Sequence, residues 1–530
     1  MAGCELHARL QPRASLILVR GRLAQKLRCM EDMLVAHPHC RFTADPGRHS
    51  ISGAVLILLC GLIVSGCLVG PDYIEPETDP PTAWGTDAAR SSARLSSQAT
   101  PDPKWWKALG DADLERVVRL AVRRNSDLEQ ARQRARKARS LVGVAESRLL
   151  PTVSANGAYN QVRISENFPV LDRFFGRGQV SPEQELYSAT FDAGWEIDIF
   201  GGARRRVQAA AGRAEAAEAG RRHVLLTVVA ESARNYVSLR QSQEEAAALE
   251  RSIALQEDTV ALARDQDESG VGTRLAVERS LAQLRALEAQ LPPVLAREAA
   301  AAYRLAVLTG RQPDAVHREL ARRKPLPSPP DLVPTGLPGT MLKRRPDVAR
   351  AERLLQAATA EVGVNVARLY PRFSLTGAAG SQAASFTQLH ATESGTWMIA
   401  PGIRWAAFQG GRIRAAIDAA EAGRREALAA YRSAIRESVA EAEGALTRYA
   451  RAFQSRNKTA GSLRHLEQAV QLARDAHDAG VVSFLEVLEA QRRLAETRQQ
   501  LAAARAEVLI ALASLNKTLG GGWPLKASSG

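Results

Sequence analysis

The sequence predicts a mixed α and β fold that is mostly α and is built from two copies of one structural unit. Three observations predict this class: an internal repeat, four segments that alternate between apolar and polar residues, and two very long helical segments. Alternation with period two is typical of a half-buried strand, whereas apolar residues spaced three and four apart indicate a helix. We therefore expect four strands per chain, two in each copy, joined to long helices.

The cysteines are confined to the start of the chain, at Cys4, Cys29, Cys40, Cys60 and Cys67. An apolar run over 51–64 follows Arg41 and Arg48 and is too short for a comfortable membrane span. Residues 1–66 are therefore interpreted as a leader with a lipoprotein signal peptide, whose translation start is Met1, Met30 or Met33.

The last leader residues, Val64-Ser65-Gly66, are small enough for a peptidase to bind the extended chain, after which the thiol of Cys67 would accept a lipid. A mature chain free of other thiols suits an oxidising compartment. By resemblance to bacterial lipoproteins, Leu68 favours export to the outer membrane. The alternative is an ordinary signal peptide that happens to contain a cysteine.

The net charge is basic, but the arrangement of the charges argues against nucleic acid as a partner. The leader carries more basic than acidic residues, so the mature chain keeps about +10 of the formal net charge of +14. Arginine alternates with glutamate along the helical stretches, as on solvated helix faces, and no aromatic-interleaved basic patch accompanies it.

The internal repeat keeps order and spacing over some two hundred residues, which argues against chance similarity between alanine-rich helices. Near its start the offset is 220, where Arg148-Leu149-x-Pro151 matches Arg368-Leu369-x-Pro371. The predicted organisation is an N-terminal lipid-anchored segment, a first repeat, a proline-rich linker, a second repeat and a tail, over residues 67–110, 111–324, 325–338, 339–523 and 524–530.

The expected strands span about 152–162, 187–200, 372–380 and 396–408. Strands of this length can cross a bilayer when tilted, with Trp and Tyr near its interfaces. We expect Tyr187, Trp195, Trp397 and Trp405 to face lipid or its interfaces. The alternate positions Asp192, Glu196 and Asp198 should face a lumen. On the alternation pattern alone, the alternative is a sheet of a soluble β-sandwich with one solvent-exposed face.

The expected long helices span about 204–267 and 412–478, or roughly 90–100 Å each at 1.5 Å per residue. The second carries a heptad seam, typical of a coiled coil, at Leu428, Tyr431, Ile435, Val439, Ala442, Leu446 and Tyr449. Gly270 and Gly480 end the two long helices, and in each repeat the chain then turns back as a shorter antiparallel helix.

Four strands cannot close a barrel, because lipid tolerates no open sheet edge and the smallest closed barrels need about eight strands. The chain must therefore oligomerise. Two copies would give eight strands and three would give twelve. Side chains fill an eight-stranded barrel, so a conduit favours the trimer.

Motifs spread over residues 64–524 resemble TolC-like outer-membrane efflux factors, and more narrowly their OprM/NodT lipoprotein branch. They include Trp105-Trp106, Asn125-x-Asp-Leu128, Phe191-Asp-x-x-Trp195-Glu-Ile-Asp198-Ile-Phe200-Gly201, Leu342-Lys-Arg-Arg-Pro-Asp347, Tyr370-Pro371-x-Phe-Ser374-Leu-Thr-Gly377, Ser483-Phe-Leu-Glu-Val-Leu-Glu489-Ala-Gln491 and Leu519-Gly-Gly-Gly-Trp523. One departure is that the branch usually has a proline where this chain has Ala406, which puts the bend between barrel and helix in doubt.

The resemblance implies a homotrimer with a twelve-stranded outer-membrane barrel, continued by a twelve-helix coiled-coil periplasmic tunnel. Such a channel is the passive exit duct of a tripartite pump that exports drugs or other small molecules. Its expected partners are a periplasmic adaptor (membrane fusion) protein, an inner-membrane transporter of the RND type and outer-membrane lipid. The alternative function is a lipid-anchored periplasmic coiled-coil adaptor or scaffold, which should contain a β-rich lipoyl-like region. The cargo is not specified by the sequence.

No enzyme motif, metal set or cofactor site is predicted: there is no GxSxG, no phosphate loop and no third ligand near His465 and His477. The only expected covalent group is the lipid on Cys67. The expected periplasmic gate is Glu486 and Glu489, three residues apart on one helical face, which the resemblance places at the tunnel tip facing the axis.

Three copies of the two glutamates would form stacked carboxylate rings that attract cations. The alternative is that both are ordinary solvated acids. The expected adaptor-docking residues lie at the two helix breaks: Gly270, Val271, Thr273, Gly480, Val481 and Ser483.

Overall fold

The computed structural model describes residues 67–87, 94–163, 165 and 183–521. The predicted leader and the C-terminal tail lie outside the described residues. Within the described part of the chain, no helix combines the length and the apolar character needed to cross a membrane.

The first repeat contains helices α4 (Ala112–Arg124), α5 (Ser126–Glu146), α7 (Gly202–Glu268), α8 (Arg274–Thr309) and α9 (Pro313–Leu320). Its strands are β2 (Thr152–Arg163) and β3 (Glu183–Ile197). The short 3-10 helices η1 (Trp105–Leu109) and η2 (Ser147–Leu149) precede α4 and β2.

The second repeat contains α10 (Pro338–Arg344), α11 (Pro346–Val366), α12 (Arg412–Asp478) and α13 (Phe484–Thr518). Its strands are β5 (Arg372–Ala383) and β6 (Gly395–Arg404), with η3 (Ala367–Leu369) before β5 and η4 (Phe386–His390) and η5 (Thr392–Ser394) between them. The mixed, mostly helical fold class is therefore confirmed.

Two expected strands end earlier than the alternation suggested. β3 stops at Ile197 rather than at residue 200, because the Asp198 side chain accepts hydrogen bonds from the backbone N–H groups of Ala203 and Arg204, both 2.9 Å, and so caps the start of α7. β6 stops at Arg404 rather than at residue 408, before the turn into α12.

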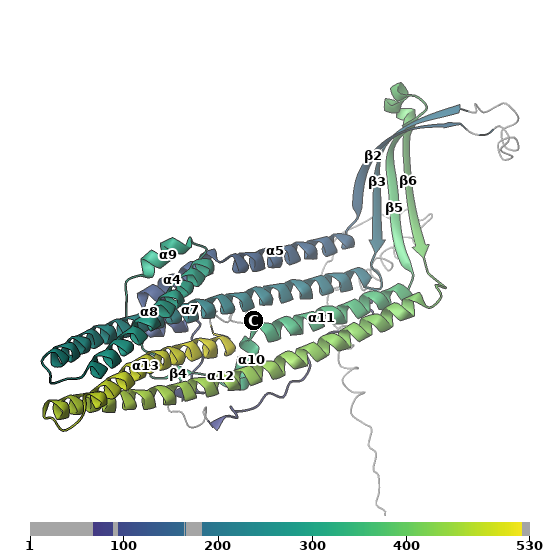
Figure 1. Ribbon diagram of the computed structural model, residues 1–530. Coiled ribbons are helices and arrows are strands. Elements are labelled where there is room, and N and C mark those ends of the chain that lie inside the picture. The colour runs from purple at the N-terminus through teal and green to yellow at the C-terminus, as the bar shows by residue number, and fades with distance from the viewer. Residues whose placement is uncertain (1–66, 88–93, 164, 166–182, 522–530) are drawn as a thin grey trace, which may run out of the picture. The chain divides into compact units, whose positions relative to one another are not determined.

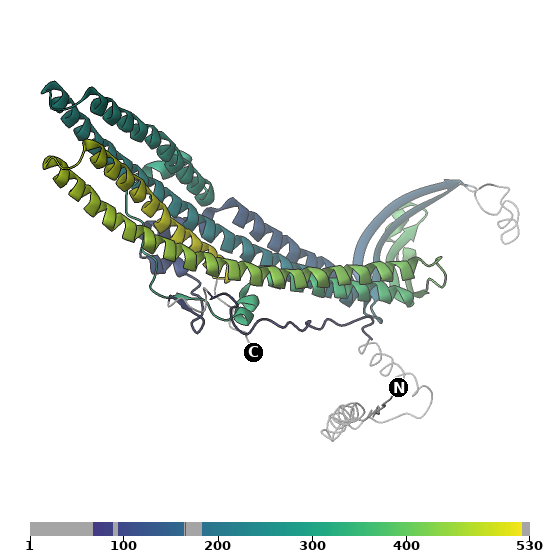
Figure 2. The same ribbon diagram turned by 60° about the horizontal axis from the view of Figure 1, so that its bottom comes forward.

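The four long strands form one antiparallel sheet in the order β2-β3-β5-β6, so each repeat contributes one hairpin and the repeats meet between β3 and β5. Figures 1 and 2 show these strands as a curved sheet. Strands β2 and β6 each have one edge without a partner among the described residues, which matches the expectation that a single chain cannot close a barrel.

The helices pack as antiparallel pairs, α7 with α8 and α12 with α13, and α11 lies between α7 and α12 (Figures 1 and 2). Close approach of α7 and α11 depends on Gly212, because a Cβ there would lie 3.0 Å from the Arg353 carbonyl oxygen and 3.1 Å from the Ala357 nitrogen. In the predicted seam of α12, Tyr431, Ala442, Leu446 and Tyr449 are buried, and the other seam residues pack against the same core.

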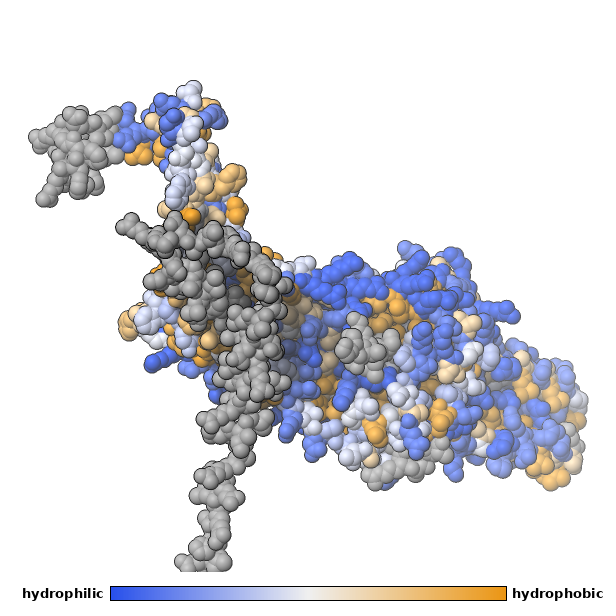
Figure 3. Space-filling view, turned by 180° about the vertical axis from the view of Figure 1, so that it is seen from behind, coloured by the Kyte–Doolittle hydropathy of each residue, from blue (hydrophilic) through white to orange (hydrophobic). Residues whose placement is uncertain are grey.

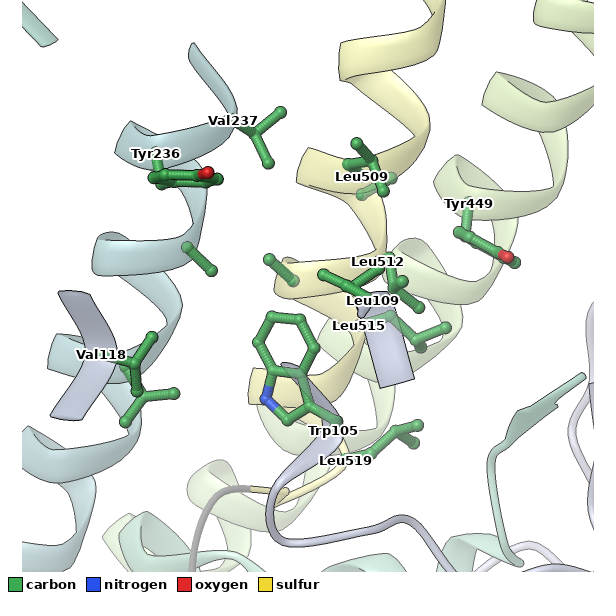
Figure 4. Close-up of a cluster of buried hydrophobic side chains, with 14 of the residues drawn as sticks. Trp105, Leu109, Val118, Tyr236, Val237, Tyr449, Leu509, Leu512, Leu515 and Leu519 are labelled. Carbon is green, nitrogen blue, oxygen red and sulfur yellow. The ribbon is translucent and has the colours of Figure 1, made fainter. Parts of the chain in front are cut away.

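The main hydrophobic core joins both repeats to the N-terminal segment. Figure 4 shows Trp105 and Leu109 of η1 beside Leu512 and Leu515 of α13 and beside Leu519, the residue that follows this helix. Tyr236 of α7 belongs to the same core. Burying side chains of this size stabilises a fold by about 1.5–3 kcal/mol each. The core therefore packs the helices of the two repeats against each other.

The proline-rich linker docks on the N-terminal segment instead of running free between the repeats. Its strand β4 (Val333–Pro334) pairs in parallel with β1 (Leu95–Ser96), and the Trp84 indole Nε1 donates to the Gly336 carbonyl at 2.8 Å. The two repeats are thus connected by a segment that is itself part of the packed structure.

The bend into α12 contains two glycines, Gly410 and Gly411, which follow Ala406 by four and five residues. Gly410 and Gly411 have φ angles of 54° and 80°, a left-handed conformation that only glycine adopts at low cost. The repeat-related bend into α7 uses Gly201, with φ of 77°. Both repeats therefore turn into their long helices through glycine, and the second does so with Ala406 in place of the proline usual in the resembling branch.

Candidate functional site

One face of the four-stranded sheet is apolar across all its strands. The register places side chains from every strand on this face: Val153, Tyr187, Phe191, Trp195, Phe373, Leu375, Trp397, Ile399 and Ile403. Several of them are mostly exposed, with Trp397 at 77% and Ile403 at 71%. Figure 3 shows hydrophobic residues along the strands, whereas hydrophilic residues cover much of the visible helices. A large exposed apolar surface of this kind marks a contact with membrane or protein.

The apolar face has a height close to that of a lipid-facing band. Tyr187 and Trp195 are eight residues apart on β3, or about 26 Å along the strand, which is about 20 Å of height at the tilt of roughly 35–45° usual in barrels. Barrels of the outer-membrane type present an apolar band about 25 Å tall between two aromatic girdles. The alternation in β3 thus indicates a single crossing of the hydrocarbon layer.

The two repeats place equivalent tryptophans at the junction between the strands and the helices. The Trp195 indole Nε1 donates to the Leu149 carbonyl oxygen at 3.0 Å, and the Trp405 Nε1 donates to the Leu369 carbonyl oxygen at the same distance. Tyr187 stacks on Tyr159 at the far end of β3, with ring centroids 4.7 Å apart. Ala379 of β5 pairs with both Phe191 of β3 and Trp397 of β6, so these two aromatic residues lie at one level of the sheet. That level is between the Trp195 end and the Tyr187 end.

The opposite face of the sheet is polar. Asp192 lies in register with Ser154 and Ala378 and accepts a hydrogen bond from the Asn156 side chain, and Glu196 lies in register with Ser374. Asp198 does not continue this row within the strand, because β3 ends at Ile197, so its lumen-facing position stays a prediction. It caps α7 and pairs with Arg204, at 3.2 Å.

The helix breaks present apolar side chains at their tips. Gly270 and Gly480 have φ angles of 74° and 72°, and the next residues, Val271 and Val481, are 83% and 76% exposed. Thr273 caps α8 by accepting from the Ala276 N–H at 3.3 Å. Ser483 is the residue before α13 and makes no side-chain cap.

The two predicted gate residues differ in their surroundings. Glu486 is exposed in the first turn of α13. Glu489 accepts hydrogen bonds from Arg492 at 2.7 and 3.0 Å and from Arg493 at 3.0 Å, and these arginines lower its pKa to about 2. Arg492 and Arg493 were missed by the sequence reasoning, although spacings of three and four residues on a helix place such pairs together.

Polar contacts also join the tip-forming helices of different repeats. The Arg505 guanidinium of α13 pairs with Glu244 of α7 at 2.9 Å, and the Gln499 side chain of α13 donates to Gln290 of α8 at 3.1 Å. No local spacing reveals contacts over such sequence separations. Both would have to break or shift if α13 moved away from α7 and α8.

One buried arginine holds the first described residues of the chain. Arg205 of α7 donates to the carbonyl oxygens of Val69 at 3.1 Å and Gly70 at 3.0 Å, and it pairs with Asp72 at 2.9 Å. Cys67 is exposed beside this contact. These contacts of Arg205, named here the Arg205 clamp, hold residues 69–72 at the start of α7.

Comparison with known proteins agrees with this geometry. The chain matches the "Outer membrane efflux protein" family over residues 117–311 and 337–521. It is 30% identical over 473 residues to the pyoverdine export outer membrane protein OpmQ of Pseudomonas putida, covering 88% of this chain and 97% of that protein. It is 26% identical over 478 residues to nodulation protein T of Rhizobium leguminosarum bv. viciae, covering 90% and 94%.

The fold is also similar to a solved outer-membrane channel. The structure of the channel OprN superimposes with a TM-score of 0.80 at 30% sequence identity, and the alignment covers 86% of this chain and 100% of OprN. The similarity therefore extends over most of this chain and all of that one.

Proposed function

The chain belongs to the outer membrane efflux protein family and is an outer membrane efflux channel, and from this premise we propose that three copies form the passive exit duct of a tripartite pump. The duct receives its cargo from a periplasmic adaptor protein and an inner-membrane transporter of the RND type. It carries no energy source of its own, so the transporter supplies the work.

The observation that carries this proposal is the two-faced sheet with unpaired edges. Lipid requires every backbone N–H and C=O group to be satisfied, and the outer edges of β2 and β6, which have no partner among the described residues, would pair with other copies of the chain. Twelve strands from three copies leave a water-filled lumen, whereas eight from two copies are filled by side chains. The family match favours this channel over a coiled-coil adaptor or scaffold.

Loss of the gene should sensitise the cells that carry it to at least one toxic compound, because that compound would no longer leave the periplasm. Minimum inhibitory concentrations over a panel of dyes, detergents and antibiotics measure the effect. Complementation with the intact gene is the control. Relatives include the pyoverdine exporter OpmQ and a toluene efflux channel, so siderophores and solvents belong in the panel. Absence of any phenotype or export defect would count against efflux.

Cys67→Ser should abolish lipidation, because the serine hydroxyl offers no thiol for the acyl-bearing group. Incorporation of a labelled fatty acid into the purified protein measures this. The Arg205 clamp and the sheet do not involve the thiol, so the variant should still form trimers on native gels. Labelling that survives the substitution would place the lipid elsewhere, and a wild type that takes up no label would show that the chain has none.

A further inference from the structure

Five arginines gather where the strands meet the helices. They are Arg148 of η2, Arg206 of α7, Arg368 of η3, Arg372 of β5 and Arg404 of β6, and we name this set the arginine collar. Arg206, Arg368 and Arg372 line one hollow between the start of α7 and the end of α11. Arg148 and Arg368 occupy matching positions in the two repeats.

The collar faces the polar side of the sheet. Arg372 and Arg404 are directly opposite each other in the register of β5 and β6. Along these strands they share the face of Ser374 and Gly402, whereas the adjacent Phe373 and Ile403 belong to the apolar face. In a closed barrel the polar face is the lumen, so the collar lies at the base of the lumen.

The collar lacks matching negative charge. Among the described residues, none of its five arginines makes an ion pair or a side-chain hydrogen bond that would neutralise it. Two acids line the hollow, Glu196 and Asp198. Asp198 is bound by Arg204 and the start of α7, so of these two acids only Glu196 is left without an ion pair or a side-chain hydrogen bond among the described residues. Burial and the charges of Arg148, Arg372 and Arg368 lower the pKa of the Arg206 guanidinium, which Glu196 only partly offsets.

Assembly adds positive charge instead of cancelling it. The sheet order leaves β2 of a neighbouring copy to pair with β6 in a closed barrel, and residues 147–154 at the start of β2 contain Arg148 and no acid, with Glu146 just before them. Like charges directly opposite in a sheet are destabilising unless something lies between them. Five arginines in each of three chains therefore form a ring of fifteen at one level of the duct.

We propose that the arginine collar binds anionic groups of the cargo, carboxylate or phosphate, as they pass from the tunnel into the barrel. Guanidinium groups bind these anions with paired, charge-assisted hydrogen bonds, and a charged ring in a pore selects by sign. This inference rests on the proposed exit duct, whose cargo class it narrows to molecules that carry at least one acidic group.

The test uses the purified trimer in planar bilayers of neutral lipid, with inorganic pyrophosphate added on the barrel side as the probe. Pyrophosphate should reduce the wild-type conductance. The triple variant Arg206→Gln, Arg368→Gln, Arg372→Gln should need about tenfold more pyrophosphate or higher, because one lost hydrogen bond to a charged group already has about that effect. The single variant Arg372→Gln, at an exposed strand position, should show a smaller shift in the same direction.

A matched control removes three arginines that form local ion pairs on outer helical turns: Arg132→Gln, Arg285→Gln, Arg318→Gln. It should be blocked like the wild type. The proposal would be overturned if pyrophosphate blocked the collar variant and the control equally. It would also be overturned if the wild type conducted but pyrophosphate did not block it. No conductance in any variant would instead contradict the exit duct. Anionic phospholipid that co-purifies with the wild type and is lost from the collar variant, without pyrophosphate block, would assign the arginines to lipid headgroups and also overturn the proposal.

Discussion

Arg240→Met is expected to lower the free energy of unfolding by about 3–5 kcal/mol, the usual cost of breaking a buried charge network from one side. The Arg240 side chain is 1% exposed and pairs with Asp113 at 3.1 Å. It also donates to the Gln243 side chain at 2.7 Å and the Arg322 carbonyl at 2.8 Å, and all of these acceptors would lose a partner. Methionine keeps the packing volume but donates no hydrogen bond.

The loss can be measured as a fall in the thermal unfolding midpoint of the detergent-solubilised trimer, followed by far-UV circular dichroism. The control is Arg323→Met, which removes an exposed guanidinium from its pair with Glu250 and should cost about 0–1 kcal/mol. Equal shifts in the two variants would mean that Arg240 contributes no more than a surface pair.

The same network should make the wild type sensitive to acid. Burial would raise the pKa of Asp113, but Lys324, Arg116 and Arg240 outweigh it and hold this pKa below its ordinary value. A carboxyl with a depressed pKa stabilises the fold above its unfolded pKa of about 3.9, and this contribution is lost as the pH falls through the lower folded value. In Arg240→Met this acid dependence should be weaker.

Local periodicity explains what the sequence could predict. Residues Tyr187 to Ile197 alternate strictly, so their two faces follow from the pleat, and the register then carries the same faces across all four strands. The seam of α12 is local in the same way. The early end of β3 was not predictable, because Asp198 fits the alternation and yet binds the start of α7.

Single buried arginines escaped the sequence reasoning for a different reason. On an alanine-rich helix, Arg205 and Arg240 look like the many solvated arginines around them. Their partners lie far away in the chain: Arg205 binds Val69 and Gly70, and Arg240 binds Asp113. No spacing rule connects such positions, and only the packed fold shows that the guanidinium is enclosed.

Glu486→Gln combined with Glu489→Gln is expected to reduce the cation preference of the channel severalfold, because the two substitutions remove six carboxylates from the tip of a trimer. The two single variants should differ. Glu486→Gln removes a charge that no described side chain pairs with. Glu489→Gln leaves Arg493 without its acid and Arg492 with only Glu496, so the local charge becomes more positive.

The reversal potential in planar bilayers under a salt gradient measures this preference. The pKa of Glu489 is lowered to about 2 by Arg492 and Arg493, so its contribution should not titrate between neutral pH and pH of about 4. The control is Glu278→Gln in α8, where the first repeat pairs an exposed glutamate with Arg274. At the repeat-related positions of Glu486 and Glu489 the first repeat has Ala276 and Arg279, so it carries no acid at these two positions. An unchanged reversal potential in the double variant would remove both glutamates from the conducting path and leave the constriction to other residues of the tip.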